Sequence, residues 1–233
     1  MKRWQDIIIV PFVIIELAIL LLVCFGVFHT QTINFIAIVI CFTFSLIFIS
    51  KKLGVIAIQV GLLFTVISDI FLVLLDARHN DVAMTTFSIT QIMYCMLLLL
   101  HVPQKRKIID SGIRVVVVIA VEVVTYCVLK EKFDYLSFIS MFYYANIILN
   151  FIFACVSFNK NPYMAIGLFF FILCDTVIGL KVANGSYINL EVGSFWYKIV
   201  SSNFNFAWLF YIPAQTLIAI SAKFEKEKGA VAP

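Results

Sequence analysis

The stretch GLLFTVISD at residues 61–69 decides the fold, because a closely similar stretch, GLFFFILCD, follows at residues 167–175. Each stretch is apolar and ends in an aspartate, so Asp69 and Asp175 lie 106 residues apart. Glu16 and Glu122, which also interrupt apolar sequence, are separated by the same interval. Carboxylates are costly in hydrocarbon and are kept there mainly for function. The shared interval predicts two related halves that bring equivalent acidic groups to the middle of the molecule.

The composition is that of a membrane protein. Of 233 residues, 63% are hydrophobic and only 13% are charged, whereas a soluble domain is roughly half apolar and a quarter charged. The net charge of +4 comes with no basic run interleaved with aromatic residues, which argues against a nucleic-acid partner. All six cysteines lie in apolar segments, and none forms a CxxC or Cys/His motif. We therefore expect no disulfide framework, metal site or other cofactor.

Eight apolar segments approach the length of about 20 residues that a spanning helix needs. They cover residues 6–28, 33–50, 53–75, 84–102, 113–129, 135–158, 162–182 and 199–222, the fifth being the shortest. With this count, 12 Lys and Arg residues lie on the side of the N-terminus and 5 on the other side. The positive-inside rule then places both termini in the cytoplasm, as in a multi-pass protein of a cell membrane.

The predicted fold is an all-α membrane protein with eight transmembrane helices in two parallel four-helix repeats. A single membrane domain spans residues 1–233, with halves at about 1–104 and 105–222 and a solvated cytoplasmic tail at 223–233. Four spans per half is an even number, so the halves run parallel. Gly61 and Gly167 precede the aspartates by eight residues, and small residues let helices approach closely. We expect these glycines to bring the third and seventh spans together.

Asp69 and Asp175 are the candidate catalytic residues. Two carboxylates in a low dielectric do not readily ionise together, so one is expected to hold a proton beside its charged neighbour, as an acid/base pair. The structural alternative is an aspartate that hydrogen-bonds a neighbouring helix. Glu16 and Glu122 lie near the midpoints of their spans, where they either hold the aspartates in place or bind Ser and Thr across the bundle.

Four further polar residues are candidates for substrate contact. Gln91 and Tyr94 share one face of the fourth span with Phe87. Tyr211 and Gln215 lie on the eighth span, beside Pro213, which is expected to kink the helix and free a carbonyl. Hydrogen bonds between helices are the alternative role for these side chains.

Together these motifs resemble the YhhN-type family of lysoplasmalogenase-like membrane proteins, from about residue 53 to the last span. The matching segments are Gly61-Leu62-Leu63-Phe64 leading to Asp69, Phe87-x3-Gln91-x2-Tyr94, Gly167-Leu168 leading to Asp175, and Tyr211-x2-Ala214-Gln215-x-Leu217-Ile218. Two positions depart from the family pattern: Gln91 stands where many members have histidine, and Cys174 where serine is common.

The resemblance implies a membrane hydrolase that cleaves the vinyl-ether bond of lysoplasmalogens to a fatty aldehyde and a glycerophospho-alcohol. The partners would be this lysophospholipid substrate and membrane lipids. One aspartate would donate a proton to carbon while the other stabilises the cation and directs water, an analogy to glycosidases. Two other readings stay open. Intramembrane carboxylates in parallel repeats also describe a proton-coupled transporter, and a non-catalytic lipid-binding protein would carry the same apolar surface.

Overall fold

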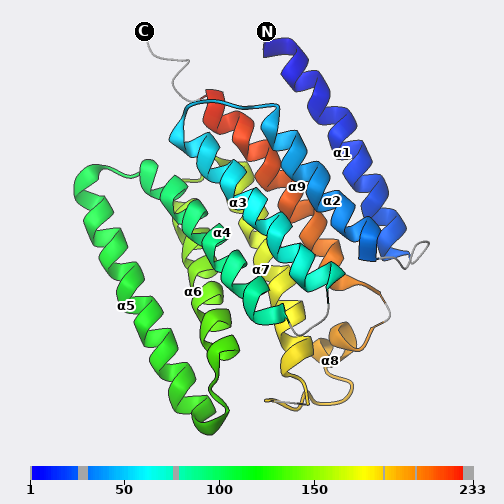
Figure 1. Ribbon diagram of the computed structural model, residues 1–233, viewed down its shortest axis with the longest axis vertical. Helices are drawn as coiled ribbons and strands as arrows, with labels where there is room; N and C mark the ends of the chain where they lie inside the picture. The colour runs from blue at the N-terminus through cyan, green and yellow to red at the C-terminus, as the bar shows by residue number, and fades with distance from the viewer. Residues whose placement is uncertain (1, 26–30, 76–78, 186, 203, 228–233) are drawn as a thin grey trace.

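The computed structural model describes residues 2–25, 31–75, 79–185, 187–202 and 204–227, and every regular element among them is helical (Figure 1). The elements are α1 (Lys2–Cys24), α2 (Gln31–Leu46), α3 (Leu53–Asp69), the π-helix η1 (Ile70–Leu74), α4 (Asn80–Leu100), α5 (Gln104–Leu129), the 3-10 helix η3 (Lys130–Lys132), α6 (Tyr135–Val156), α7 (Pro162–Ala183), α8 (Phe195–Val200) and α9 (Phe206–Glu227). The predicted all-α class is therefore confirmed.

Among the described residues, six helices are long and apolar enough to cross a membrane, namely α1, α3 with η1, α4, α5, α6 and α7. These helices fit a multi-pass integral membrane protein. Of the two other predicted spans, α2 is apolar but has only 16 residues. The last helix, α9, carries charged residues near its end and buries much of its length against other helices.

Helix ends follow local capping rules where the chain leaves the apolar region. Asp134 caps α6, because its Oδ1 accepts hydrogen bonds from the Ser137 N–H at 2.8 Å and the Ser137 hydroxyl at 2.6 Å. These bonds favour the carboxylate and lower the pKa of Asp134 below its ordinary value. Asn161 caps α7, where Pro162 occupies the first turn.

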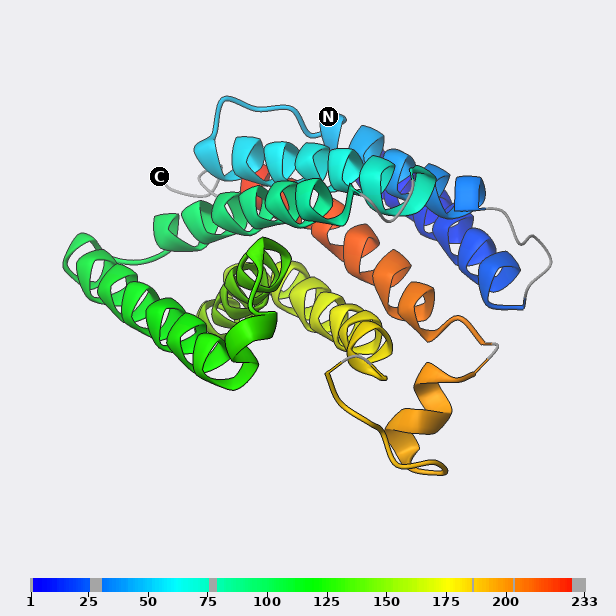
Figure 2. The same ribbon diagram turned by 60° about the horizontal axis from the view of Figure 1, so that its bottom comes forward.

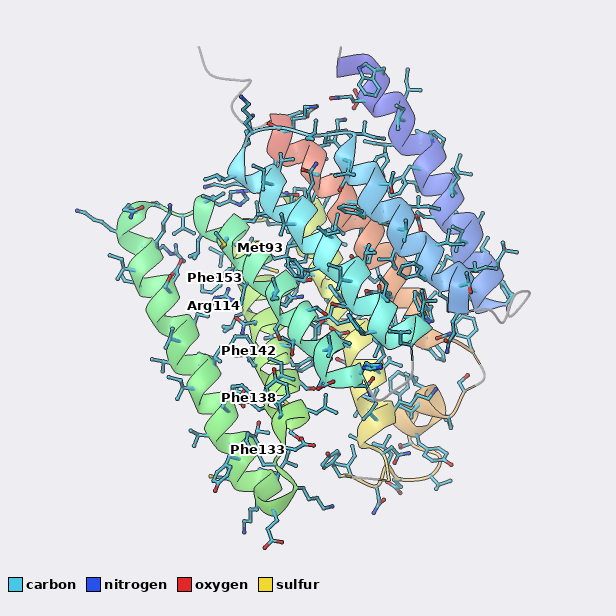
Figure 3. All side chains as sticks on the ribbon, viewed as in Figure 1. Met93, Arg114, Phe133, Phe138, Phe142 and Phe153 are labelled. Carbon is cyan, nitrogen blue, oxygen red and sulfur yellow. The ribbon has the colours of Figure 1, made fainter. Side chains whose placement is uncertain are left out.

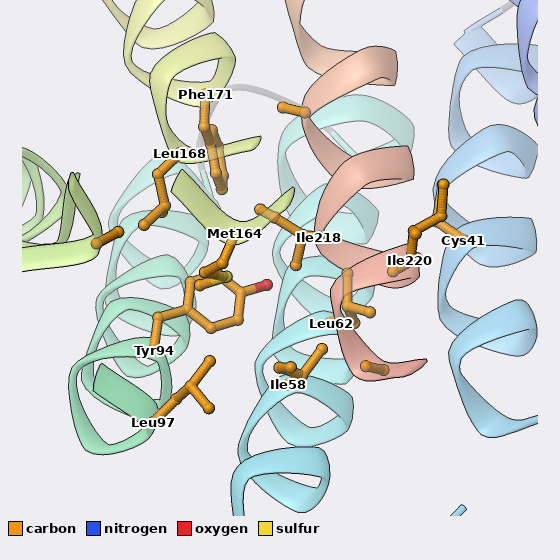
Figure 4. Close-up of a cluster of buried hydrophobic side chains, with 14 of the residues drawn as sticks. Cys41, Ile58, Leu62, Tyr94, Leu97, Met164, Leu168, Phe171, Ile218 and Ile220 are labelled. Carbon is orange, nitrogen blue, oxygen red and sulfur yellow. The ribbon is translucent and has the colours of Figure 1, made fainter. Parts of the chain in front are cut away.

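The bundle is organised around α9. This helix packs against α7, α3, α2 and α1, whereas α4 packs between α3 and α6. At the edge, α5 packs mainly against α6 and stands away from the other helices in both views (Figures 1 and 2). The core lies where α3, α4, α7 and α9 meet, with Leu62, Tyr94, Leu168 and Ile218 almost fully buried (Figure 4).

Two predicted boundaries in the second half are wrong. The fifth segment, predicted at 113–129, is part of α5, which has 26 residues and begins at Gln104. Its first turns contain Lys105, Arg106 and Lys107, so a prediction from hydropathy places the start of the helix too late. The eighth helix begins at Phe206 rather than 199, since residues 195–200 form the separate α8. In addition, α9 continues through Pro213 as one helix.

The predicted solvated tail is also wrong over residues 223–227, which are the last turns of α9, while 228–233 lie outside the described residues. Lys223 and Glu225 are 7% and 6% exposed. Lys223 pairs with Asp6 of α1. Glu225 accepts a hydrogen bond from Asn161 Nδ2 at 2.9 Å and lies 3.1 Å from His101 Nε2. These charges are buried because they find polar partners on α1, α4 and the start of α7.

The two repeated glycines pack different helices from those predicted. A side chain at Gly61 would overlap the ring of Tyr94 on α4, and one at Gly167 would meet Ile218 and Ala214 on α9. The glycines therefore bring α3 against α4 and α7 against α9, not α3 against α7. Helix pairs recur in the same order in both halves: α1 with α2 and α5 with α6, α2 with α3 and α6 with α7, α3 with α4 and α7 with α9.

Candidate functional site

Asp69 and Asp175 are brought together by the fold, each with a tyrosine as partner. Asp69 is the last residue of α3 and is 1% exposed, and its Oδ2 accepts a hydrogen bond of 2.8 Å from the Tyr211 hydroxyl of α9. Asp175 lies in α7, is partly exposed, and accepts a hydrogen bond from the Tyr143 hydroxyl of α6. The rings of both tyrosines lie beside Phe171, with centroid distances of 5.4 Å for Tyr211 and 6.5 Å for Tyr143, so the two aspartates belong to one part of the bundle. Four helices therefore contribute to one acidic pair.

A distinct local structure follows each aspartate: a π-helix follows Asp69, and a hydroxyl contact to α6 follows Asp175. After Asp69 the chain widens into the π-helix η1, where the Leu75 N–H donates to the carbonyl of Ile70 at 3.0 Å. Single π turns occur frequently at functional sites. Beside Asp175, the Thr176 hydroxyl lies 2.8 Å from the Tyr144 hydroxyl. Two adjacent tyrosines of α6 thus hold two adjacent residues of α7.

Aromatic rings surround the acidic pair. The ring centroid of Phe171 lies 5.4 Å from that of Tyr211 and 6.5 Å from that of Tyr143. Phe87 of α4 lies 5.7 Å from Tyr143 and 6.1 Å from Phe171, and Trp208 lies 5.3 Å from Tyr211. These rings pack around the two tyrosines that bind the aspartates, and an apolar wall of this kind strengthens electrostatic interactions beside it.

Several buried polar atoms of the core have no hydrogen-bond partner among the described residues. They are Oδ1 of Asp69, Nε2 of Gln91, and both amide atoms of Gln215, on α3, α4 and α9. Gln91 and Gln215 are both 0% exposed. Buried polar groups in proteins are nearly always satisfied, and leaving one unpaired costs about 1–3 kcal/mol. Such atoms are the expected signature of bound water or a polar ligand in the core.

Gln91 belongs to a second polar cluster, which sequence reasoning missed. Asn150 Nδ2 donates to both the carbonyl and Oε1 of Gln91 at 2.9 Å. The guanidinium of Arg114 donates to Asn150 Oδ1 at 2.8 Å and to Asn146 Oδ1 at 2.9 Å. The structure therefore joins Gln91 to α6 and α5 through side chains, and not to either aspartate. Tyr94 lies one turn further along α4, fully buried with its ring against Gly61.

A spacing signal for the missed residues was present in the sequence. Tyr143, Asn146 and Asn150 follow one another at i, i+3 and i+7, which places all three on one face of α6. Tyr143 is the partner of Asp175, so this polar stripe connects the two clusters along a single helix.

The two glutamates do not join the acidic pair. Glu16 is 2% exposed, and its Oε1 accepts a hydrogen bond of 3.5 Å from the Cys41 thiol, which lies 3.9 Å from the Thr216 hydroxyl. It therefore links α1 to α2 and α9. Glu122 is half-buried on α5, and neither of its carboxylate oxygens has a partner among the described residues. Neither glutamate hydrogen-bonds Asp69 or Asp175 in the part of the chain that is described.

The fold and the site together define an all-helical integral membrane protein with an intramembrane pair of carboxyl groups. Residues 17–222 match the YhhN family, and the chain belongs to that family. The match spans both halves and contains every candidate site residue except Glu16. Comparison with curated proteins gave no match, and comparison with solved structures gave none either.

Proposed function

We propose that this protein is a membrane hydrolase that cleaves the vinyl-ether bond of lysoplasmalogens by aspartate acid/base catalysis. Membership of the YhhN family is consistent with a lysoplasmalogenase-like protein. The observation that carries the proposal is the pair Asp69 and Asp175, each of which accepts a hydrogen bond from a separate tyrosine, and both tyrosine rings lie beside Phe171.

The reaction needs one proton donor and one carboxylate. A proton from one carboxyl group adds to the vinyl carbon remote from the ether oxygen, giving an oxocarbenium ion. Water then adds to the carbon bonded to oxygen and gives up a proton to the other carboxylate, which forms a hemiacetal. The hemiacetal then collapses: its hydroxyl proton passes to the first carboxylate, the C–O bond to glycerol breaks, and the glycerol oxygen takes the proton held by the second carboxyl group. The products are a fatty aldehyde and a glycerophospho-alcohol, and both carboxyl groups return to their starting states. The two carboxyl groups supply general acid and general base in turn.

The environments of the two aspartates suggest which one is the acid. Asp69 is almost completely buried, and its Oδ1 has no partner among the described residues. A carboxyl group in such a place is far more stable neutral than charged, so it can hold the proton on Oδ1. Asp175 is partly exposed and accepts the Tyr143 hydrogen bond. We assign Asp69 as the acid and Asp175 as the carboxylate that stabilises the cation and directs water.

The other candidate residues have roles in this proposal that follow from their chemistry. Tyr211 and Tyr143 orient the carboxyl groups, and the unpaired Nε2 of Gln91 and the unpaired amide of Gln215 bind water or the polar head group. The aromatic side chains hold the alkenyl chain. Glu16 stabilises the packing of α1 against α2 through the Cys41 thiol.

We further propose that the chain crosses the membrane eight times, with α2 and α9 as the two additional spans. A helix of 16 residues is about 24 Å long, and local thinning of the bilayer accommodates such a segment. The start of α1 and the end of α9 lie at the same end of the bundle, as an even number of spans requires (Figure 1). The recurring helix pairs support parallel halves at about 1–104 and 105–222. The Lys and Arg distribution favours a cytoplasmic location for both termini.

Release of aldehyde from purified protein in detergent tests the proposed reaction. The substrate is a vinyl-ether lysolipid, and an acyl lysolipid of equal chain length is the control. Asp69→Asn and Asp175→Asn are each expected to lower the rate on the order of a thousandfold, equivalent to about 4 kcal/mol of barrier. Asp134→Asn is the matched control, because asparagine also caps a helix well. Equal activity in all three variants would refute the assignment.

The same preparation separates the proposal from its two rivals. A proton-coupled transporter predicts pH-driven uptake into liposomes and no aldehyde from detergent-solubilised protein. A non-catalytic lipid-binding protein predicts lysolipid binding that survives both aspartate substitutions, again without aldehyde.

A further inference from the structure

A groove with a volume of about 500 Å³ runs between α5 and α6, away from the acidic pair. Most of its lining consists of aliphatic side chains, including Ile113, Val117 and Val121 of α5 and Ile148, Ile152 and Val156 of α6. Both helices are long and apolar enough to span a membrane. The groove therefore faces the acyl chains of the bilayer, and its aliphatic walls are suited to bind one of them.

The groove is long enough to span one leaflet. It extends along α5 from Arg106 to Val121, a separation of 15 residues or roughly 22 Å of helix. Half of the hydrocarbon core of a bilayer is about 15 Å thick. A single acyl chain from one leaflet therefore fits along the groove, with its head group at the Arg106 end.

That end of the groove is basic. Lys105, Arg106 and Lys107 form the first turn of α5, and Asp110 is the one carboxylate in the groove lining that faces them. Arg106 Nε lies 3.5 Å from Asp110 Oδ2, so this pair is neutral and the two lysines supply the net positive charge. Basic residues at the membrane surface attract anionic lipids by about 1 kcal/mol each. The amide groups at the start of a helix favour the same kind of ligand.

A polar tie sets the spacing of the two groove walls. Arg114 reaches from α5 to Asn146 and Asn150 of α6, and its guanidinium lies over the ring of Phe153 at 5.3 Å (Figure 3). Phe153 also lines the groove. The tie holds α5 against α6 along one edge, and the groove remains between the branched side chains beside it.

We propose that the groove between α5 and α6 binds a resident diacyl phospholipid with an anionic head group. One acyl chain lies along the groove, and the phosphate lies at the first turn of α5, beside Lys105 and Lys107. This lipid is distinct from the lysolipid substrate, and the proposal does not depend on the proposed reaction.

Native mass spectrometry of the purified full chain tests the proposal, with phosphatidylglycerol and phosphatidylcholine of identical acyl chains as probes. The wild-type chain is expected to retain one phosphatidylglycerol in preference to phosphatidylcholine. Val117→Phe fills the groove and is expected to abolish retention of both lipids. Val116→Phe is the matched control, because Val116 is 67% exposed on a neighbouring face and this variant retains lipid like the wild type.

A charge series tests the head-group preference. Lys105→Gln with Lys107→Gln is expected to reduce the preference for phosphatidylglycerol by more than tenfold, whereas Lys181→Gln with Lys198→Gln at the opposite end of the bundle leaves it unchanged. Equal retention by the Val117→Phe and Val116→Phe variants would overturn the proposal. A dimer that Val117→Phe dissociates would also overturn it, because the groove would then bind a second copy. Retention of a lysolipid but of neither diacyl lipid would do the same.

Discussion

Gly167 provides the sharpest test of how the bundle is held together. A Cβ atom at this position would lie 2.8 Å from Cγ1 of Ile218 and 3.1 Å from the carbonyl oxygen of Ala214, both on α9. The side chain of Ile218 is fully buried and the carbonyl belongs to the helix backbone, so neither can rotate away. In Gly167→Ala, α7 and α9 must therefore separate by a few tenths of an ångström.

The magnitude follows from two opposing effects. Overpacking a buried contact costs about 1–3 kcal/mol. Alanine in place of glycine inside a helix recovers about 1 kcal/mol. We expect Gly167→Ala to lower the free energy of unfolding by up to about 2 kcal/mol. Gly179→Ala on the same helix introduces a methyl group with no heavy atom within 4 Å, so only the favourable effect remains and stability should rise by about 0.5–1 kcal/mol.

The pair can be compared in detergent by thermal unfolding, followed by circular dichroism, under identical conditions. Because both substitutions are Gly→Ala on α7, effects of detergent and of helix propensity cancel in the difference, which we expect to equal the overpacking cost of about 1–3 kcal/mol. A Gly167→Ala variant as stable as Gly179→Ala would refute the close approach of α7 to α9. Intact stability with unchanged aldehyde release would further show that the acidic pair does not depend on this contact.

Three further predictions follow from individual hydrogen bonds. Tyr143→Phe keeps the ring but removes the donor to Asp175, and kcat/KM for aldehyde release should fall by about 10- to 100-fold, as expected for a bond to a charged group. Asn150→Leu leaves Arg114 without one acceptor, and the free energy of unfolding measured by thermal denaturation should fall by about 2 kcal/mol. Asp134→Ala removes the cap of α6 and should cost about 1 kcal/mol at neutral pH. Because the folded-state pKa of Asp134 is lowered, the difference from wild type should shrink as the pH falls through that pKa.

Local sequence was enough to predict the helical class, and it singled out two aspartates as candidates. Carboxylates within apolar runs are rare, so Asp69 and Asp175 stood out without any knowledge of the packing. The same reasoning selected Glu16, which is buried as expected but against Cys41 of α2 rather than near the aspartates. The position of a polar residue within an apolar segment indicates that the residue lies in the membrane. It does not indicate which neighbouring helix the side chain faces.

The predictions that failed depended on contacts between distant parts of the chain. Lys223 and Glu225 have the composition of a solvated tail, and only their partners on other helices make burial possible. Gly61 and Gly167 correctly indicate close packing, yet the packing partner is the next long helix in each half. Hydropathy also placed the start of the fifth helix too late in the chain. Basic residues continue a helix into the membrane interface as readily as apolar residues do within the bilayer.

Asp69 and Asp175, which lie 106 residues apart, differ in what surrounds them, and this difference bears on the proposed chemistry. The position 106 residues before Tyr143 is Ala37, which is fully buried and has no hydroxyl to donate. Asp69 instead receives its hydrogen bond from Tyr211 of α9, so both tyrosines lie in the second part of the chain. Two carboxyl groups in identical surroundings can share one proton, but either could then be the donor. In the proposed reaction, unequal partners fix which group holds the proton, and they assign the acid role to Asp69 and the carboxylate role to Asp175.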